Sequence, residues 1–161
     1  MLLYADDGKV FSKFANSSPA DLQSDIDKIY EWAVRWSMQF NATKCKILHL
    51  GKTNPQFNYE MNNVTLDSVS DIKDLGIVVD HSLKFHLQTN TVIGKANQIL
   101  SVIKRSFSYL DSQTFLLLYK TTVRPILEYC NTVRGPHYKM DQDAIENVQR
   151  RVTRLVKEIT I

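Results

Sequence analysis

The spacing of apolar residues constrains the fold of this 161-residue chain most, because the spacing changes along the sequence. Over residues 18–36, and again from Lys84 onward, apolar side chains recur every three or four positions, as on one face of a helix. From Lys46 to Val79 they form short β-prone runs separated by turn residues. This order predicts an α+β fold, in which a helix on a small antiparallel sheet is followed by an all-helical segment.

The first helix has a start signal as well as a periodic pattern. Ser18 is a typical N-cap, Pro19 fits the first helical position, and Asp21 is the acidic residue expected in the first turn. The apolar positions behind this start predict a face packed on a core, and they are Leu22, Ile26, Ile29, Ala33 and Trp36.

The helical spacing and the short β-prone runs predict further elements. We expect strands at residues 46–50, 57–59, 64–66 and 77–79, with turns at Asn54-Pro55, Asn62-Asn63 and Asp80-His81-Ser82. Pro125 is expected to break a helix or to begin a new one. The C-terminal helical faces comprise Val92, Ala96, Ile99 and Ile103, then Phe115, Leu118 and Tyr119, and last Ile145, Val148, Val152 and Leu155.

Composition excludes several classes of protein. With 43% hydrophobic and 23% charged residues, the chain is neither disordered nor membrane-spanning, since no apolar run approaches the roughly 18 residues that a span needs. Acidic residues follow the first apolar residues too soon for a signal peptide, so we expect an intracellular protein, nuclear or cytoplasmic. Cys45 and Cys130 stand far apart, which favours plain buried thiols over a metal site.

Charge is distributed unevenly between the two ends. Residues 1–83 have a net charge of −3, and residues 84–161 have a net charge of +6. A basic rear part suggests an anionic partner such as nucleic acid, although solvated helix faces give the same count. The candidate contacts to a nucleic-acid backbone, or equally an ordinary solvated face, are Arg150, Arg151, Arg154 and Lys157.

Two adjacent acids near the start carry the strongest chemical signal. Leu2-Leu3-Tyr4 and Lys9-Val10-Phe11 are β-prone runs around Ala5-Asp6-Asp7-Gly8, which predicts a hairpin. Carboxylates on a tight hairpin suit Mg²⁺, which prefers hard oxygen ligands and serves phosphoryl transfer in pairs. We assign Asp6 the direct metal role and Asp7 a supporting one, while an ordinary Asp-Asp-Gly turn is the alternative.

Tyr4-Ala5-Asp6-Asp7 resembles the catalytic hairpin of reverse transcriptases, and the resemblance continues in order along the chain. The later motifs are similar to those of the non-LTR retrotransposon (LINE-type) enzymes. They are Leu22-Gln23, Trp32, Trp36, Met38, Phe40-Asn41, Lys44-Cys45-Lys46, Asp74-Leu75-Gly76-Ile77-Val78-Val79-Asp80, Lys95-Ala96-Asn97, Ile103-Lys104-Arg105-Ser106-Phe107, Leu118-Tyr119-Lys120, Val123-Arg124-Pro125-Ile126-Leu127-Glu128-Tyr129 and Ile145-Glu146-Asn147-Val148-Gln149-Arg150-Arg151.

The resemblance implies the C-terminal part of a polymerase palm over residues 1–83 and a helical connection or thumb over residues 84–161. It also implies Mg²⁺, deoxynucleotide triphosphates, an RNA template and a DNA primer. Asp6 and Asp7 would be metal carboxylates, and Tyr4 would lie near the nascent base pair.

The resemblance gives roles to three further positions. Lys44 would stand beside the nucleotide, where a cation can neutralise leaving-group charge, although it also fits a surface lysine. Leu75 and Gly76 would place backbone at the primer, since glycine permits a close approach; otherwise they are a core leucine and a turn glycine. The aromatic residues could stack on bases, but their helical spacing favours core packing, and they are Trp32, Trp36, Phe107, Phe115 and Tyr119.

The departures from the family are as informative as the matches. The family has a further catalytic Asp and the fingers upstream of this hairpin, so we expect a fragment that is inactive alone and needs an N-terminal palm and fingers portion. Arg134 stands where the family usually has Trp, which suggests drift or a lesion in the thumb. Two alternatives stay open: a non-catalytic nucleic-acid-binding or scaffolding module, and a reading frame without function.

Overall fold

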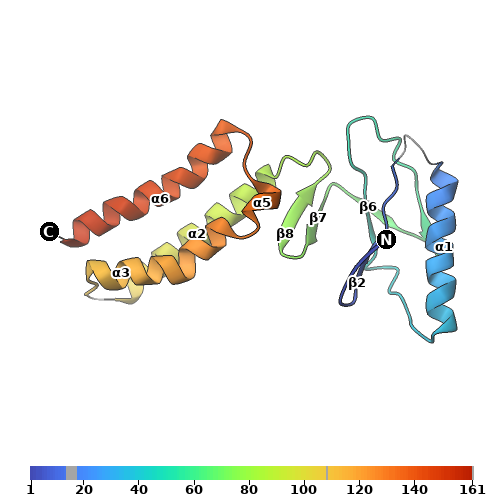
Figure 1. The fold of residues 1–161 in the computed structure, drawn as a ribbon, viewed down its shortest axis with the longest axis horizontal. Coiled ribbons are helices and arrows are strands. Elements are labelled where there is room, and N and C mark those ends of the chain that lie inside the picture. Colours follow the sequence, from blue (N-terminus) through green and yellow to red (C-terminus); the bar gives the residue numbers. More distant parts are fainter. Residues whose placement is uncertain (14–17, 108, 161) are drawn as a thin grey trace. The chain divides into compact units, whose positions relative to one another are not determined.

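A computed structural model of the chain, shown in Figure 1, describes residues 1–13, 18–107 and 109–160. The chain forms two compact units, Met1–Ile72 and Lys73–Ile161, which we call the N-terminal and the C-terminal unit. The boundary lies inside the strand that precedes Leu75. Most of the hairpin around Leu75 therefore belongs to the C-terminal unit, together with the helices that follow it. No helix in the described part of the chain has the length and apolar character needed to cross a membrane.

The described part of the N-terminal unit contains a helix and several short strands. They are β1 (Leu2–Tyr4), β2 (Asp7–Lys9), α1 (Pro19–Arg35), β3 (Lys46–Leu48), β4 (Glu60–Met61), β5 (Val64–Thr65) and β6 (Asp67–Val69).

The start of α1 confirms the predicted cap. The Ser18 hydroxyl accepts a hydrogen bond from the Ala20 amide at 3.1 Å, and Asp21 accepts one from the Ser18 amide at 2.7 Å. This reciprocal capping box satisfies two amides that a helix start leaves without partners. Ile26 and Ala33 are buried as predicted.

Helix α1 packs on the strands through a small core. Ile26 meets Tyr59, Met61 and Leu66, and half-buried side chains such as Ile47 pack around them. The Gln23 side chain also pairs with the Glu60 backbone, because its amide donates to the Glu60 carbonyl at 2.8 Å and its oxygen accepts from the Glu60 amide at 3.0 Å. A side-chain amide here continues the hydrogen-bond pattern of a strand.

The prediction of a single small antiparallel sheet is wrong. The described strands form separate two-stranded pairs, of which β1–β2 and β4–β5 are antiparallel, whereas β3–β6 is parallel. A parallel pair needs a long crossover, and residues 49–66 supply it with the β4–β5 hairpin inside it. Residues 57–59, expected to be a strand, are not one; strand β4 begins only at Glu60.

The C-terminal unit consists of a hairpin and a group of helices, with β7 beginning just before the boundary. Its elements are β7 (Asp71–Asp74), β8 (Ile77–Asp80), α2 (His86–Ser106), α3 (Ser112–Leu118), the π-helical turn η1 (Tyr119–Val123), α4 (Arg124–Glu128), α5 (Asn131–Arg134) and α6 (Lys139–Thr160).

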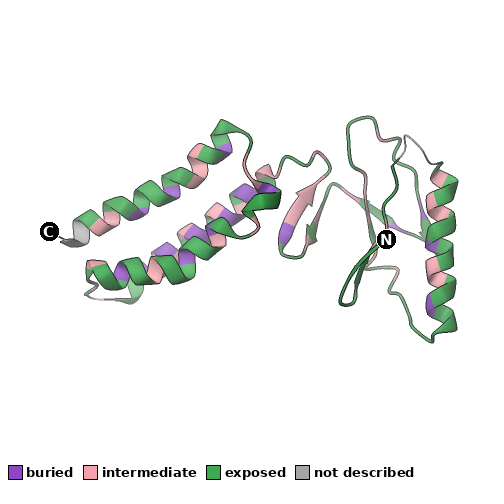
Figure 2. Cartoon of the chain, viewed as in Figure 1, coloured by how far each residue is buried: buried purple, intermediate pink, exposed green. Residues whose placement is uncertain are grey.

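The larger core lies between α2, the continuous helical segment α3–η1–α4, and α6, which we call the helical rods. Helix α2 contacts both α4 and α6, and α3 contacts α6. Buried positions, purple in Figure 2, recur along each rod as the sequence period predicts. The fully or nearly buried side chains are Val92, Ala96, Leu100, Ile103, Phe115, Val123, Leu127, Val148 and Val152.

Pro125 lies in the first turn of α4, so the expected new start is confirmed, although α4 continues directly from the helical residues before it. The helix passes from α3 through η1 into α4, and the Arg124 amide bonds to the Tyr119 carbonyl five residues earlier. Widening the helix by this π-turn accommodates a proline, which has no amide hydrogen to offer.

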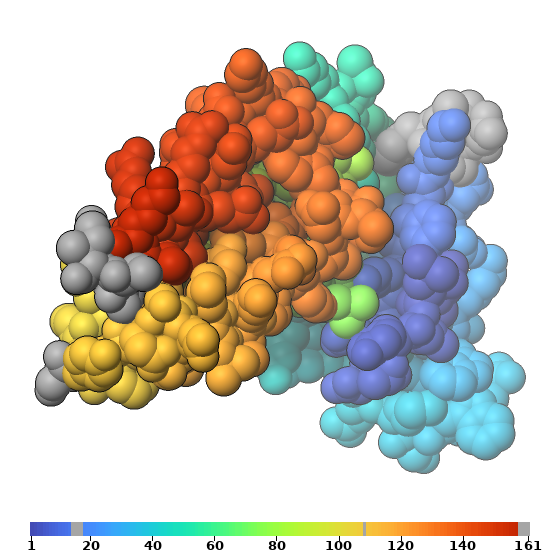
Figure 3. Space-filling model, turned by 60° about the vertical axis from the view of Figure 1, so that its left-hand side comes forward, coloured from blue at the N-terminus to red at the C-terminus, as the bar shows by residue number. Residues whose placement is uncertain are grey.

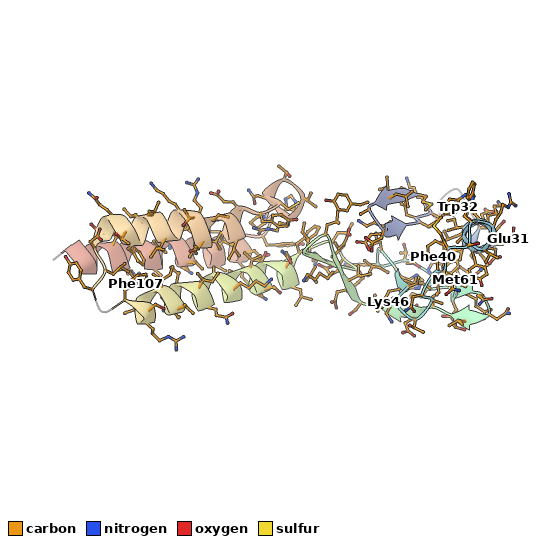
Figure 4. All side chains as sticks on the ribbon, turned by 90° about the horizontal axis from the view of Figure 1, so that it is seen from below. Glu31, Trp32, Phe40, Lys46, Met61 and Phe107 are labelled. Atoms are coloured by element: carbon orange, nitrogen blue, oxygen red, sulfur yellow. The ribbon has the colours of Figure 1, made fainter. Side chains whose placement is uncertain are left out.

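The core-packing expectation holds for only some aromatic residues. Phe115 is 1% exposed and Tyr119 is half-buried, but Trp36 is 64% exposed. Trp32 and Phe107, both labelled in Figure 4, are 49% and 45% exposed. Helical spacing predicted burial for all of them, and it was wrong for these three because the small N-terminal core covers little of α1 and because Phe107 follows the end of α2.

The loop into α2 depends on one carboxylate. Asp80 accepts hydrogen bonds from the Ser82 amide at 2.8 Å, from the Ser82 hydroxyl, and from the Phe85 amide at 2.9 Å. A longer bond, 3.4 Å, comes from the Lys84 amide. Phe85 is the N-cap of α2, has φ of +58°, and provides no side-chain cap, while Asp80 orders the loop that leads to it.

Candidate functional site

The acidic pair lies on a two-residue hairpin turn. Tyr4 pairs with Asp7 at the end of β1–β2, which leaves Ala5 and Asp6 as the turn. The hairpin itself is as predicted, but its turn residues lie two positions before the Asp7-Gly8 pair, and Gly8 pairs with Leu3 inside the ladder. Ala5 has φ of +52°, a backbone conformation that suits glycine or asparagine better.

Both carboxylates point away from any core. Asp6 and Asp7 are exposed, as are the apolar residues of β1 beside them. Within residues 1–13, 18–107 and 109–160, no group of three His, Cys, Asp or Glu side chains is placed to hold a metal ion. Two neighbouring carboxylates are the donor type that Mg²⁺ takes alongside substrate phosphates, so the pair fits part of a magnesium site.

Lys44 lies exposed in the tight turn between α1 and β3. Its amide donates to the Asn41 carbonyl at 3.0 Å. The Asn41 side chain accepts from both the Thr43 amide, at 3.1 Å, and the Thr43 hydroxyl, at 2.6 Å. The turn thus fixes the backbone from which the Lys44 cation extends, in the same unit as the acidic pair.

Leu75 and Gly76 form the two-residue turn of the β7–β8 hairpin in the C-terminal unit. Leu75 has φ of +45° and Gly76 has φ of +86°. Both positive values correspond to the turn type that joins antiparallel strands through two residues. The Leu75 side chain is 44% exposed, so it is not the core leucine that was the alternative expectation.

The Leu75–Gly76 turn is held by Tyr129, which sequence analysis named within a motif but gave no role. The Tyr129 hydroxyl donates to the Leu75 carbonyl at 2.8 Å. A methyl group placed on Gly76 would lie 3.6 Å from the Tyr129 ring, so ring and turn are in contact. No pattern in the sequence could connect these residues, because 54 positions separate Leu75 from Tyr129.

Arg134 is fully buried; two of its guanidinium nitrogens donate hydrogen bonds, and the third has no hydrogen-bond partner among the residues that the structure describes. Its Nε donates to the Tyr129 carbonyl at 2.8 Å, and a second nitrogen donates to the Leu127 carbonyl. These carbonyls lie at the end of α4, where helices leave acceptors unpaired. Burial lowers the pKa of Arg134, and the nearby Cys130 raises it by a smaller amount.

The four C-terminal cations are exposed on α6; Arg150, Arg154 and Lys157 lie opposite its buried residues, while Arg151 lies at the edge of the buried face beside α2. Arg150 is paired with Glu146 at 3.2 Å, and Arg151 donates to the Asn97 side chain at 3.2 Å. Figure 3 shows α6, in red, on the surface of the molecule. All four cations are exposed, and two of the arginines have protein partners.

Comparison with known proteins places the chain near one class, the RNA-directed DNA polymerases of mobile elements. It is 29% identical over 163 residues to the RNA-directed DNA polymerase from mobile element jockey of Drosophila funebris, an alignment that covers 95% of this chain. This homology confirms the resemblance to reverse transcriptases of non-LTR elements. The chain spans only 17% of that relative's length. No family model matches, and no solved structure matches.

Proposed function

We propose that this chain is a segment of the reverse transcriptase of a non-LTR retrotransposon, and that it contributes an acidic palm hairpin and a helical segment that contacts primer and template. One observation carries the proposal. Two adjacent carboxylates stand exposed at a hairpin turn within a chain whose similarity to an RNA-directed DNA polymerase covers 95% of its length.

The proposed roles follow the chemistry of each side chain. Asp6 is a direct ligand of Mg²⁺ and Asp7 supports it. The bound metal would activate the primer 3′-hydroxyl and stabilise the leaving pyrophosphate. Lys44 places positive charge beside the triphosphate. Tyr4, the last residue of β1, lies next to the acidic turn and contacts the nascent base pair.

We further propose that the rest of the polymerase palm packs on the β1–β2 hairpin. Leu2, Leu3 and Tyr4 are more than 60% exposed, and Phe11 just beyond β2 is 67% exposed. A two-stranded hairpin is marginal without a covered face. A further segment of the polymerase carrying the family's other catalytic Asp would cover these apolar residues and complete the metal site.

Primer extension tests the proposal. We expect the 161-residue chain alone to incorporate no nucleotide on an RNA template with a DNA primer and Mg²⁺, since one missing positioned charge costs about 3 kcal/mol or more, roughly a hundredfold in rate. The same chain within a longer polymerase should be active, and Asp6→Asn should abolish that activity. Lys52→Gln, an exposed lysine in a loop, is the matched control. Synthesis by the isolated chain would refute the claim of incompleteness.

The exposed basic face of α6 supports the second candidate function, a nucleic-acid-binding module without catalysis. Reversing Arg150, Arg151 and Arg154 to Glu should abolish binding to a primer–template duplex and flatten its salt dependence, because each lost phosphate contact removes about 0.9 from the log–log slope. Reversing Lys52 should change neither. Unchanged affinity in the triple variant would exclude α6 as the contact surface.

A further inference from the structure

The C-terminal unit contains a connected series of contacts from a buried cation to the tip of an exposed hairpin. Arg134 holds the carbonyl of Tyr129, and the Tyr129 hydroxyl holds the carbonyl of Leu75. Leu75 and Gly76 are the turn that the proposed function places at the primer. We propose that Tyr129 and Arg134 are positioning residues that fix this turn for contact with the primer end. The inference rests on the proposed function and deepens it.

The anchor of this series is a buried side chain. Arg134 is 0% exposed, and its two hydrogen bonds, to the carbonyls of Leu127 and Tyr129, end α4 at a defined point. Tyr129 adopts an extended backbone conformation there, with its amide bonded to the Pro125 carbonyl at 2.9 Å. The direction in which the Tyr129 ring leaves the helix is therefore set by backbone and buried side chain together.

The ring itself is not a core residue. Tyr129 is 52% exposed, so apolar burial is a weak reason for its presence. Its specific contacts are with the turn, through the hydroxyl at 2.8 Å from the Leu75 carbonyl and through the ring beside Gly76. A half-exposed tyrosine whose polar tip binds a turn carbonyl orients that turn rather than filling a core.

The turn needs such an anchor because it is strained. A leucine at φ of +45° costs about 1–3 kcal/mol relative to the residues that prefer this region, and such strain persists only where surrounding contacts enforce it. Leu75 nevertheless exposes its side chain at the tip. Leucine is thus present against its backbone preference and without core burial, as it also is at Leu83; the contact with Tyr129 is what distinguishes Leu75.

The test uses the full chain with an RNA template annealed to a DNA primer whose 3′-terminal nucleotide carries a photoreactive base. We expect the wild-type crosslink to map to the peptide containing Leu75 and Gly76. Tyr129→Phe, which removes only the hydroxyl, should lower the crosslink yield at least threefold, while duplex affinity changes less than twofold. Tyr109→Phe, an exposed tyrosine, is the matched control and should change neither.

A spectroscopic signal separates positioning from general stability. The Gly76 nitrogen shares a peptide group with the Leu75 carbonyl, so losing the Tyr129 hydrogen bond should shift the Gly76 amide resonance while α6 resonances stay in place. Leu75→Asn relieves the strain and should raise thermal stability, yet it should also lower the crosslink at least threefold.

The outcomes are distinct. A wild-type chain that binds the duplex without crosslinking at this turn overturns the proposed place of the turn, and the inference with it. A wild-type crosslink that persists in Tyr129→Phe, with an unshifted Gly76 resonance, overturns the inference alone and leaves the proposed function standing.

Discussion

Replacing Asp80 with Asn should destabilise the C-terminal unit at neutral pH and not at pH 2. Partial burial of this carboxyl raises its pKa, but hydrogen bonds from Ser82, Phe85 and Lys84 outweigh that effect and lower the pKa from 3.8 to about 2. Folding therefore stabilises the ionised form of the Asp80 carboxylate relative to its protonated form.

The sign and size of the effect follow from the two pKa values. A depressed pKa contributes stability that is complete above about pH 4–5 and is lost as pH falls through 4 toward 2. The shift is equivalent to about 2 kcal/mol at most, since one pKa unit is about 1.4 kcal/mol. Solvent screening of this half-buried group reduces the expected value to about 1–2 kcal/mol.

Chemical unfolding followed by circular dichroism at 222 nm, repeated from pH 7 to pH 2, measures the difference between wild type and Asp80→Asn. Both tryptophans, Trp32 and Trp36, lie in the N-terminal unit, so their fluorescence transition serves as an internal control that should not change. Asp71→Asn, an exposed acid in the same hairpin, should be nearly neutral. If the two stability curves stay parallel down to pH 2, the proposed origin of the stabilisation is wrong.

Three further predictions concern single residues. Arg134→Leu should lower the unfolding free energy by about 2–4 kcal/mol, because two carbonyls at the end of α4 lose their donors. Arg134→Trp keeps one N–H donor and much of the volume, so its unfolding free energy, measured in the same denaturant titration, should fall by less. Gly76→Ala should destabilise the C-terminal unit by about 1–2 kcal/mol, measured by thermal melting, since its φ of +86° disfavours a side chain although space exists for one. Burial raises the pKa of the Cys45 thiol more than Lys46 lowers it, so at pH 8 its alkylation, followed by mass spectrometry, should be slower than that of a free cysteine peptide; equal rates would contradict this.

Local signals in the sequence predicted local structure well. The Ser18 cap with Pro19 and Asp21 formed as expected, because the partners of each hydrogen bond lie within three residues. Asn62 and Asn63 formed the turn between β4 and β5, each at positive φ, which asparagine tolerates. The buried faces of the C-terminal helices also matched their period.

Features that depend on distant partners were not predictable. The parallel pairing of β3 with β6 leaves no trace in either strand's composition, since period two is the same in both directions. Arg134 looks like a misplaced charge until the carbonyls of Leu127 and Tyr129 are found around it. Residues 75 and 76 were expected in the same part of the chain as the acidic pair, yet the contact between Leu75 and Tyr129 belongs to the C-terminal unit.

Three two-residue hairpin turns among the described residues provide a comparison within one molecule. Asn62–Asn63 has residues that suit positive φ, as expected where a turn only has to connect strands. The other two turns carry Ala5 and Leu75 at positive φ, where asparagine or glycine would be more stable. These are also the two turns to which sequence resemblance assigns metal and primer contacts. Local rules tend to fail where function selects the residue, so positive φ at Ala5 and Leu75 agrees with the proposed metal and primer contacts, although Leu83, Phe85 and Cys130 share this backbone conformation.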